Sequence, residues 1–441
     1  MNAELRAKLL SADEAAALVK SGDWVDYGAA VGQPDLFDAA LARRKDALRG
    51  VRIRACLSMA PRAVLDADPT GEHFLWFNWH FSGIERGHAT DGRCSYIPMN
   101  FGEAPGYYRR FIDPIDVVCI RTAPMDSHGH FNFGGAVANT KAITERAKVL
   151  VVETCEAMPY VYGSQASVHV SEVDHVIDGG RGALPELKNP PVSEADRKVA
   201  ALIAAEIEDG SCLQIGIGGM PNAVCLALKD TGVRDLGIHT EMFVDGMVDL
   251  IESGVVNGAR KVLDPGQAVF TFAAGSRRMY DFIDRNPAVQ SHPVDYTNSP
   301  ETIQRNERVI SVNNTTQIDL QGQVASESDG HRHLTGTGGQ LQFVRGAYAS
   351  KGGKSFICLS STWDKRGERR SRVVSTLTPG NVVTTPRTDV MYVVTEYGIV
   401  NLKGKSVAER AKALIALAHP DFREGLEREA RELRLLPRAF R

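Results

Sequence analysis

A glutamate stands at an unusual place in the sequence, directly after a short apolar run and just before a helical pattern. Residues 236–250 read LGIHTEMFVDGMVDL, and the glutamate is Glu241. Buried strands more often end in small or turn-forming residues, so a carboxylate between apolar neighbours suggests chemistry. By itself, Glu241 also fits an acid in the first turn of a helix, where the helix dipole favours negative charge.

Two glycine-rich segments could present backbone amides to a ligand. The first runs from Gly216 to Pro221 as GIGGMP and precedes a helical pattern, and free N–H groups at a helix start favour an anion such as phosphate. The second contains Gly336, Gly338 and Gly339 and also precedes a helical pattern. Its backbone can approach a ligand closely, with amides pointing at developing negative charge. A tight turn alone would also explain either segment.

The first of these segments resembles a dinucleotide-binding fingerprint. Gly216 and Gly218 would begin GxGxxG, and Glu241, 23 residues beyond Gly218, would bind ribose hydroxyls. The third glycine position is occupied by Pro221, however, whose ring obstructs the close helix–strand approach that a glycine permits. An NAD-binding protein is therefore the weaker interpretation.

Two further segments carry residue types that bind ligands elsewhere. Residues 363–372 read WDKRGERRSR, a basic loop that is typical of a solvated surface but could meet a phosphate. His128 and His130 are two positions apart, as a metal-binding pair on one strand would be. No acidic residue or cysteine at a suitable spacing completes such a site, so we expect no metal.

Composition excludes several classes of function. The chain has 441 residues and a formal net charge of -3, which gives no reason to expect nucleic acid or an anionic membrane as partner. The N-terminal residues lack the apolar core of a signal peptide, and no stretch approaches the roughly 18 apolar residues of a membrane span. The seven cysteines are widely spaced and form no CxxC motif. We therefore expect a cytoplasmic protein without disulfides or structural zinc.

An internal duplication indicates how the fold is built. Residues 22–41 (GDWVDYGAAVGQPDLFDAAL) resemble residues 210–228 (GSCLQIGIGGMPNAVCLAL). Each copy follows a helical segment that begins at a serine, and each then reads as strand, glycine turn and second helix. A weaker similarity links the β-rich runs that begin at Asp116 and Asp389.

The repeat predicts an α/β fold of two similar domains. Apolar runs without alternation, such as KVLVVE and FICLS, fit strands covered on both faces and hence mainly parallel sheets. A polar, proline-rich segment around residues 179–198 marks the boundary. We expect an N-terminal α/β domain over residues 1–185 and a C-terminal one over residues 186–441. Ligands of such sheets bind at the carboxyl ends of strands, where we expect Glu241.

The chain as a whole resembles a known family. The resemblance rests on GIGGMPNAV, LGIHTEMFVDGMVDLIESG, DYTNSPE, GTGGQLQFVRGA and VVTEYGIVNLKGKSVAERAKALIALAHPDFR. These segments are similar to those of acetyl-CoA hydrolase/transferase family proteins (family I CoA-transferases), and among them to 4-hydroxybutyrate and butyryl-CoA:acetate CoA-transferases. The resemblance implies the CoA-transferase fold, two similar α/β domains with the active site between them. It also implies acyl-CoA and small carboxylates as substrates, no permanently bound cofactor, and a homodimer or higher homo-oligomer.

The resemblance also implies roles for individual residues. Glu241 would be the covalent catalyst, which attacks the acyl-CoA thioester and passes through a glutamyl-CoA thioester that conserves the thioester energy. The oxyanion site would use the amide of Gly338 or Gly339 and the side chain of Asn298. The CoA site would use Gly216, Ile217, Gly218, Gly219, Met220, Gly336 and Lys365.

One departure from the family pattern bears on the substrate. Relatives often read GGQVDF where this chain reads GGQLQF, so that Gln342 replaces a common aspartate. The loss of a negative charge beside the active-site loop favours an acyl group with a second carboxylate, as in bacterial itaconate CoA-transferases that use succinyl-CoA. We therefore expect succinyl-CoA:itaconate transfer. The alternatives are 4-hydroxybutyrate or butyrate:acetate transfer, acyl-CoA hydrolysis, and a non-catalytic ligand sensor.

Overall fold

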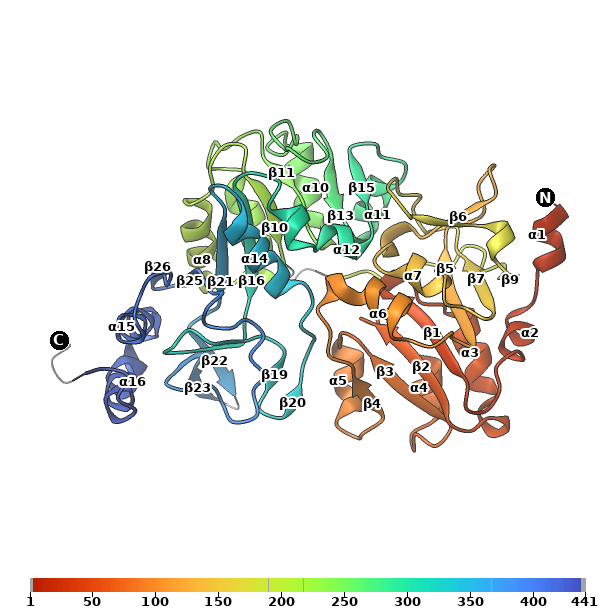
Figure 1. Cartoon of the computed structure of the whole chain (residues 1–441), viewed down its shortest axis with the longest axis horizontal. Coiled ribbons are helices and arrows are strands. Elements are labelled where there is room, and N and C mark those ends of the chain that lie inside the picture. Colours follow the sequence, from red (N-terminus) through yellow and green to blue (C-terminus); the bar gives the residue numbers. More distant parts are fainter. Residues whose placement is uncertain (1–2, 189, 217, 366, 438–441) are drawn as a thin grey trace.

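Two mainly parallel β-sheets, one in each half of the chain, organise the molecule (Figure 1). The computed structural model describes residues 3–188, 190–216, 218–365 and 367–437. Helices flank the strands of both sheets, so the predicted α/β class with mainly parallel sheets is confirmed. No helix within these ranges is long and apolar enough to cross a membrane.

The first sheet consists of parallel strands in the order β4–β3–β2–β1–β5–β7–β9. Every residue of β5 and β7 is buried, as expected for strands covered on both faces. The strands are β1 (Trp24–Ala29), β2 (Val51–Cys56), β3 (Phe74–Asn78), β4 (Cys94–Tyr96), β5 (Val117–Thr122), β7 (Leu150–Thr154) and β9 (His175–Ile177), with β6 (His130–Asn132) and β8 (Ser167–His169) paired apart from them. The helices are α1 (Ala3–Lys8), α2 (Ala12–Ala16), α3 (Leu36–Arg43), α4 (Ala63–Ala67), α5 (Gly83–Ala89), α6 (Ala104–Arg110) and α7 (Thr140–Thr144).

The second sheet has the order β11–β10–β16–β21–β25–β26, and β26 runs antiparallel to β25. Its strands are β10 (Cys212–Ile215), β11 (Gly237–Ile238), β16 (Val309–Asn314), β21 (Lys354–Cys358), β25 (Tyr392–Thr395) and β26 (Gly398–Asn401). The helices of this half are α8 (Glu194–Ala204), α9 (Gly219–Leu228), α10 (Asp245–Glu252), α11 (Arg277–Ile283), α12 (Val294–Thr297), α13 (Pro300–Ile303), α14 (Gln340–Ala349), α15 (Val407–Leu417) and α16 (Pro420–Glu432).

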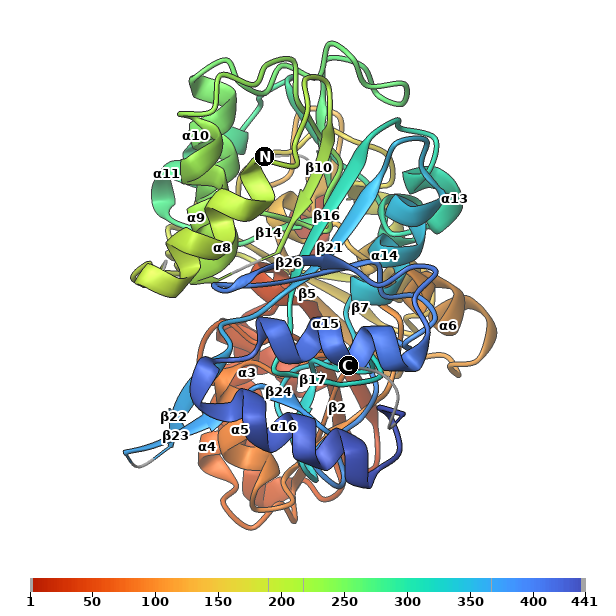
Figure 2. The ribbon, with the colours of Figure 1, turned by 90° about the vertical axis from the view of Figure 1, so that its left-hand side faces the viewer.

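Short strands complete the C-terminal half. Two small parallel pairs continue from the end of β11, and a hairpin of β22 and β23 projects from the lower part of the molecule in Figure 2. The same view shows α15 and α16 side by side on the face toward the viewer. The short strands are β12 (Met242–Phe243), β13 (Ala268–Phe270), β14 (Phe272–Ala273), β15 (Val289–Ser291), β17 (Gln317–Asp319), β18 (Val324–Ala325), β19 (Ser328–Asp329), β20 (Arg332–His333), β22 (Thr362–Lys365), β23 (Glu368–Ser371) and β24 (Val373–Val374).

Both copies of the predicted repeat fold alike. Ser11 and Ser193 begin the first helix of their copies, α2 and α8, and each forms a capping box. Each helix precedes a strand, β1 or β10, and each strand leads through a turn into a second helix, α3 or α9. The weaker similarity, between the runs from Asp116 and Asp389, does not extend to the topology. β5 lies beside β1, whereas β16 and β21 separate β25 from β10, so this second pairing is wrong.

The two halves share an apolar core. One cluster of buried side chains joins Met158 and Val161 of the N-terminal half to Phe243 and Phe270 of the C-terminal half. The division into residues 1–185 and 186–441 stays a proposal. It is supported by the position of the two sheets, because β9 ends before this point and α8 begins after it.

Candidate active site

The carboxyl ends of strands from both sheets meet at one cavity of about 480 Å³. Ala29 and Cys56, at the ends of β1 and β2, line it from one side. Gly216, Asn314 and Cys358, at or just beyond the ends of β10, β16 and β21, line it from the other. This is where ligands of parallel sheets bind. The cavity therefore lies between the two halves of the chain.

Glu241 lines this cavity from a short connection between β11 and β12. Its carbonyl oxygen accepts hydrogen bonds from the amides of Thr271 and Phe272 at 3.0 and 3.2 Å, which fixes the backbone. Helix α10 begins only at Asp245, and Asp245 is the acid of its first turn. Glu241 therefore does not serve as the first-turn acid of that helix.

Two helix ends bring polar partners to the Glu241 carboxylate. Asn298 stands at the C-terminal end of α12, and its Nδ2 donates to Oε2 of Glu241 at 2.6 Å. The amide of Gly339, at the start of α14, also donates to this carboxylate. Burial raises the pKa of Glu241 to about 7, although the hydrogen bonds from Asn298 and Gly339 oppose the shift. Near neutral pH the carboxylate is thus present in both protonation states.

The glycines of the GTGGQ segment are required by their surroundings. A Cβ on Gly339 would collide with Oε2 of Glu241 and Nδ2 of Asn298. Gly338 has a φ of +56°, a backbone conformation that residues other than glycine rarely adopt. A Cβ on Gly336 would lie 2.8 Å from Nδ1 of His80. The backbone at Gly339 therefore approaches the carboxylate too closely to leave room for a side chain.

The N-terminal half holds the GTGGQ segment in place. The amide of Phe101 donates to the carbonyl of Gly338 at 3.0 Å, and the amide of Phe81 donates to the carbonyl of Thr335 at 3.0 Å. The amide of Thr337 donates to the hydroxyl of Tyr96 at 3.2 Å. Both halves are therefore needed to shape the surroundings of Glu241.

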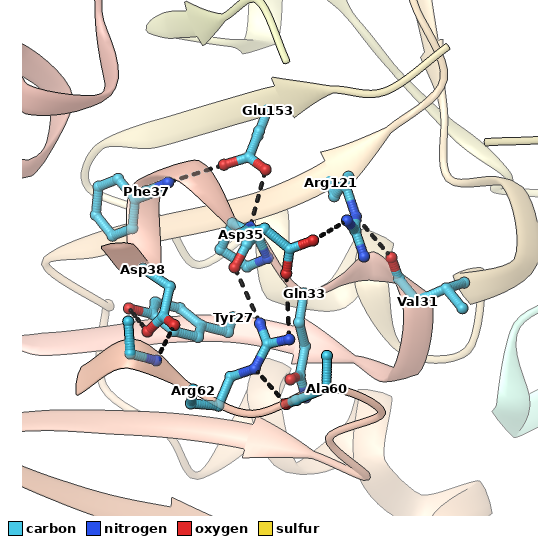
Figure 3. Close-up of polar contacts among 12 residues, drawn as sticks. Tyr27, Val31, Gln33, Asp35, Phe37, Asp38, Ala60, Arg62, Arg121 and Glu153 are labelled. Carbon is cyan, nitrogen blue, oxygen red and sulfur yellow. Dashed lines mark hydrogen bonds and ion pairs between the residues drawn. The ribbon is translucent and has the colours of Figure 1, made fainter. Parts of the chain in front are cut away.

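A cluster of polar contacts surrounds the turn that follows β1 (Figure 3). Asp35 pairs with Arg62 at 3.2 Å and also with Arg121, and Arg121 donates to the carbonyl of Val31 at 3.0 Å. Glu153 accepts hydrogen bonds from the amides that begin α3. Burial raises the pKa of Glu153, although these hydrogen bonds lower it. These bonds hold the turn after β1 and thereby the cavity-lining end of that strand.

His80 lines the cavity and was not singled out from the sequence. It follows β3 and lies beside Gly336 and Gly338. Burial, with the nearby charges of His333 and Arg86, lowers the pKa of His80 to about 4, so the ring is neutral at pH 7. The stretch around it, FNWHFSG, matches no motif, and only the fold brings it to the site.

The residues proposed to bind CoA are partly brought together. Gly216, Met220 and Gly336 line the cavity. Gly218 and Gly219 form the start of α9. Ile217 lies outside the described residues, and so does the side chain of Lys365, which ends β22.

The environment of Gln342 does not support the argument made from its charge. Its Oε1 accepts a hydrogen bond from the amide of Gly102 at 2.8 Å, across the two halves of the chain. Gln342 is not among the described residues that line the cavity. The replacement of an aspartate here therefore gives no support for a second carboxylate on the acyl group.

The remaining candidates contribute no metal site. His130 contacts His169 ring to ring, with centroids 5.0 Å apart, and the amides of His128 and His130 both donate to Asp126. Across the part of the chain that the structure describes, no group of His, Cys, Asp and Glu side chains could hold a metal ion.

Comparison with known proteins gives the same family throughout the chain. The acetyl-CoA hydrolase/transferase N-terminal domain matches residues 1–182, and the C-terminal domain of that family matches residues 275–430. Butyryl-CoA:acetate CoA-transferase of Anaerostipes caccae is 44% identical over 99% of this chain and 98% of its own length. 4-Hydroxybutyrate coenzyme A transferase of Clostridium kluyveri is 38% identical over 96% of this chain and 97% of its own.

A solved structure agrees with these sequence relatives. The crystal structure of RipA from Yersinia pestis superimposes with a TM-score of 0.91 at 38% identity, covering 99% of this chain and 100% of its own. Fold, cavity and relatives thus agree, and the chain is a CoA-transferase that belongs to the acetyl-CoA hydrolase/transferase family.

Proposed function

We propose that the protein transfers CoA from a short acyl-CoA to a small carboxylic acid through a covalent thioester on Glu241. One observation carries this proposal. The Glu241 carboxylate faces the cavity between the halves and accepts hydrogen bonds from Asn298 and Gly339. A carboxyl group with a pKa of about 7 is partly ionised at neutral pH. Its ionised form can attack a thioester carbonyl, and the same carboxylate can later leave again as the leaving group.

The proposed reaction has two covalent stages. An oxygen of ionised Glu241 attacks the thioester carbonyl, the C–S bond breaks, and CoA leaves as a thiolate while an acyl-glutamyl anhydride forms. The thiolate then attacks the glutamyl carbonyl carbon, so that the first acid leaves as a carboxylate and a glutamyl-CoA thioester remains. An incoming carboxylate reverses both stages.

The hydrogen-bond donors around Glu241 have a part in each stage. Asn298 Nδ2 and the amide of Gly339 already contact its carboxylate, and the same donors would stabilise an oxyanion when the glutamyl carbonyl becomes tetrahedral. The loss of one such donor typically costs roughly 3 kcal/mol of transition-state stabilisation.

We infer that the acyl group is a short monocarboxylate, such as butyrate or 4-hydroxybutyrate. The named activities of the two relatives above support these acids. The lining of the cavity supports them too, because Met99, Phe101 and Phe272 present apolar surface and His80 is neutral. The sequence favoured itaconate because of Gln342, but the position of Gln342 gives no support for that acid.

A panel of acids tests the transfer. Enzyme with butyryl-CoA or succinyl-CoA is given acetate, butyrate, 4-hydroxybutyrate or itaconate, while new acyl-CoA and free thiol are followed. We expect butyryl-CoA and acetate to yield acetyl-CoA without accumulation of thiol. Thiol release that is independent of the acids would indicate a hydrolase, and inertness toward every thioester would indicate a ligand sensor. Preferred transfer to itaconate would restore the dicarboxylate interpretation. A titration followed by nicotinamide fluorescence tests whether the protein is instead an NAD-binding protein.

The role of Glu241 has a direct chemical test. Enzyme incubated with acyl-CoA alone should accumulate a CoA adduct on the peptide that contains Glu241, and borohydride should reduce that thioester to an alcohol. Glu241→Gln should form no adduct. Asp245→Asn is the matched control four residues away, because Asp245 bonds Ser276 and does not line the cavity. An adduct on Glu241→Gln, or exchange above about a tenth of the wild-type rate (under about 1.4 kcal/mol of added barrier), would contradict the mechanism.

Two further properties belong to the proposal. The seven cysteines are all buried as free thiols, which supports a reducing, cytoplasmic setting. The homodimer or higher homo-oligomer implied by the family resemblance stays a prediction, for which light scattering is the test.

A further inference from the structure

One cationic side chain lines the cavity on the side of the C-terminal half. Arg372 lies between β23 and β24 and is the last residue of the basic segment 363–372. Its amide donates to the carbonyl of Ser361 at 2.8 Å, and its carbonyl accepts from the amide of Ile318 at 3.0 Å. Its Nη1 donates to the carbonyl of Thr316 at 3.2 Å. Backbone and side chain are therefore both fixed before any ligand binds.

The charge of Arg372 has no acidic partner among the described residues. Its Nε is buried and makes no hydrogen bond there, and burial is the cause that lowers its pKa. A guanidinium nevertheless stays protonated in proteins. Arg372 is only partly exposed, and an incompletely solvated charge without an acidic partner is costly, so an anion supplied by a ligand would relieve that cost.

The neighbouring arginines differ from Arg372 in this respect. Arg369 lies 3.5 Å from a carboxylate oxygen of Asp421, and Arg370 lies 2.8 Å from one of Glu368. Both are exposed at the surface. Of the predicted basic segment, Arg372 is the residue that reaches the cavity, and among the described lining residues it is the sole lysine or arginine.

Arg372 and Glu241 line the cavity from different elements. Arg372 stands between β23 and β24 and contacts Thr316, whereas Glu241 stands between β11 and β12 and contacts Asn298 and Gly339. The thioester must lie at Glu241. A second acid on the lining, Asp196, is engaged by the amide and hydroxyl of Ser193 at 2.9 and 2.7 Å. In an acyl-CoA with a monocarboxylate acyl group, such as butyryl-CoA, the part that carries negative charge away from the thioester is the phosphate-bearing nucleotide end.

We propose that Arg372 binds the pyrophosphate of CoA and so anchors the substrate while the thioester reaches Glu241. The proposal rests on the proposed CoA-transferase function. The pyrophosphate adjoins the pantetheine arm that enters the cavity, whereas the 3′-phosphate lies beyond the adenosine ribose. An arginine fork suits phosphate oxygens, since it can donate two parallel hydrogen bonds.

Truncated thioesters test this assignment. Wild type, Arg372→Gln and the control Arg370→Gln are compared with butyryl-CoA, butyryl-dephospho-CoA and butyryl-pantetheine, with acetate as acceptor. We expect Arg372→Gln to lower kcat/KM by about 10- to 100-fold for the first two donors, as loss of a charged hydrogen bond does. For butyryl-pantetheine, which has no phosphate, Arg372→Gln and wild type should be equal. Arg370→Gln should resemble wild type throughout.

Each other outcome overturns the assignment. Equal losses with butyryl-pantetheine would place Arg372 at the reacting end or in the fold, and a loss with butyryl-CoA alone would assign it to the 3′-phosphate. No loss with any donor would remove it from substrate binding. If Arg372→Gln fails to fold, Arg372→Lys, which keeps the charge but not the fork, should show a smaller loss with the same donor pattern. Failure of the proposed function itself would be distinct, because wild type would then transfer CoA from none of the donors.

Discussion

The Glu241 carboxylate makes opposite contributions to activity and to stability. Its folded pKa of about 7 lies above the ordinary value of 4.5, because burial disfavours the charged form. A carboxyl group with a raised folded pKa stabilises the fold fully only below its unfolded pKa. That contribution is lost as the pH rises from about 4.5 through about 7.

Glu241→Gln should therefore be inactive but more stable than wild type at pH 8. Glutamine keeps an oxygen that can accept from Asn298 and carries no charge, so the gain at pH 8 should be on the order of 1 to 3 kcal/mol. The gain should shrink as the pH falls toward 5. Urea unfolding of both proteins at pH 5 and pH 8 measures the difference.

The control for this prediction is Asp245→Asn. Asp245 does stand in the first turn of α10 and accepts from the amide of Ser276 at 2.9 Å, so its loss should lower stability. If Glu241→Gln destabilised the protein at pH 8 in the same way, Glu241 would be an ordinary structural acid, and the proposed cost of its buried charge at neutral pH would be refuted.

At the same scale, the sequence predicted some site residues and missed others for a physical reason. Glu241, Asn298 and Gly339 were named together, because each stands in a segment whose local pattern resembles a family, and the structure brings these three into contact. His80 stands in a segment without such a pattern, and Arg372 is one of several arginines in the basic segment 363–372, whose sequence does not show which of them reaches the cavity. Their burial, their neutral or unpaired state and their access to the cavity arise only when distant strands come together.

At the scale of elements, the GTGGQ segment shows two different demands for glycine. At Gly339 the backbone conformation is ordinary, with φ of -98°, but a Cβ would occupy the space of the Glu241 carboxylate and the Asn298 amide. At Gly338 a Cβ would make only ordinary contacts, with the nearest atom 3.6 Å away, but φ is +56°. One position is restricted by contact and the other by conformation.

Alanine at these two positions should have different effects. Gly339→Ala should displace Glu241 or Asn298 and reduce kcat/KM by at least about 100-fold, as loss of an oxyanion donor does. Gly338→Ala should mainly cost stability, about 1 kcal/mol, because a left-handed conformation is strained for alanine. Steady-state kinetics and denaturant unfolding of both variants separate these effects. Equal kinetic losses at both positions would show that the loop, rather than the contact at Gly339, governs the rate.

The same scale explains why the substrate was harder to predict than the catalyst. Gln342 follows the glycines by three residues, and proximity in sequence suggested a place beside the acyl group. On α14, however, its side chain contacts Gly102 of the other half. A helix turns successive side chains to different sides, so closeness in sequence to the site does not give closeness to the cavity.

At the scale of the whole molecule, the carboxyl ends of the strands in one half of the repeat lie opposite those of the other half. Each sheet brings the carboxyl ends of its central strands to the same cavity, so neither half encloses the site without the other. The α/β class and the first repeat could be predicted from apolar runs and glycine turns. The packing of one sheet edge against the other could not, because the apolar contacts that join the halves link residues far apart in the sequence.

These contacts predict how the protein unfolds. Relative motion of domains is expected unless their interface is large and hydrophobic. Here one buried cluster includes Met158 and Val161 together with Phe243 and Phe270, and a second includes Met242 and Phe272 among residues of the first half. Neither half can lose its packing without exposing apolar surface on the other, so thermal unfolding should occur in a single transition.

Two substitutions in the N-terminal half distinguish coupled from independent unfolding. Met158 lies in the shared cluster, whereas Leu41 lies in a cluster built from residues of the N-terminal half. Truncation of either to alanine should cost roughly 2–5 kcal/mol, as for other large buried side chains. Because the halves are coupled, Leu41→Ala should lower the midpoint of the same single transition as Met158→Ala in a calorimetric scan. If the scan instead resolved two transitions and Leu41→Ala moved only one of them, the halves would unfold independently. The cavity between them would then open without loss of either sheet.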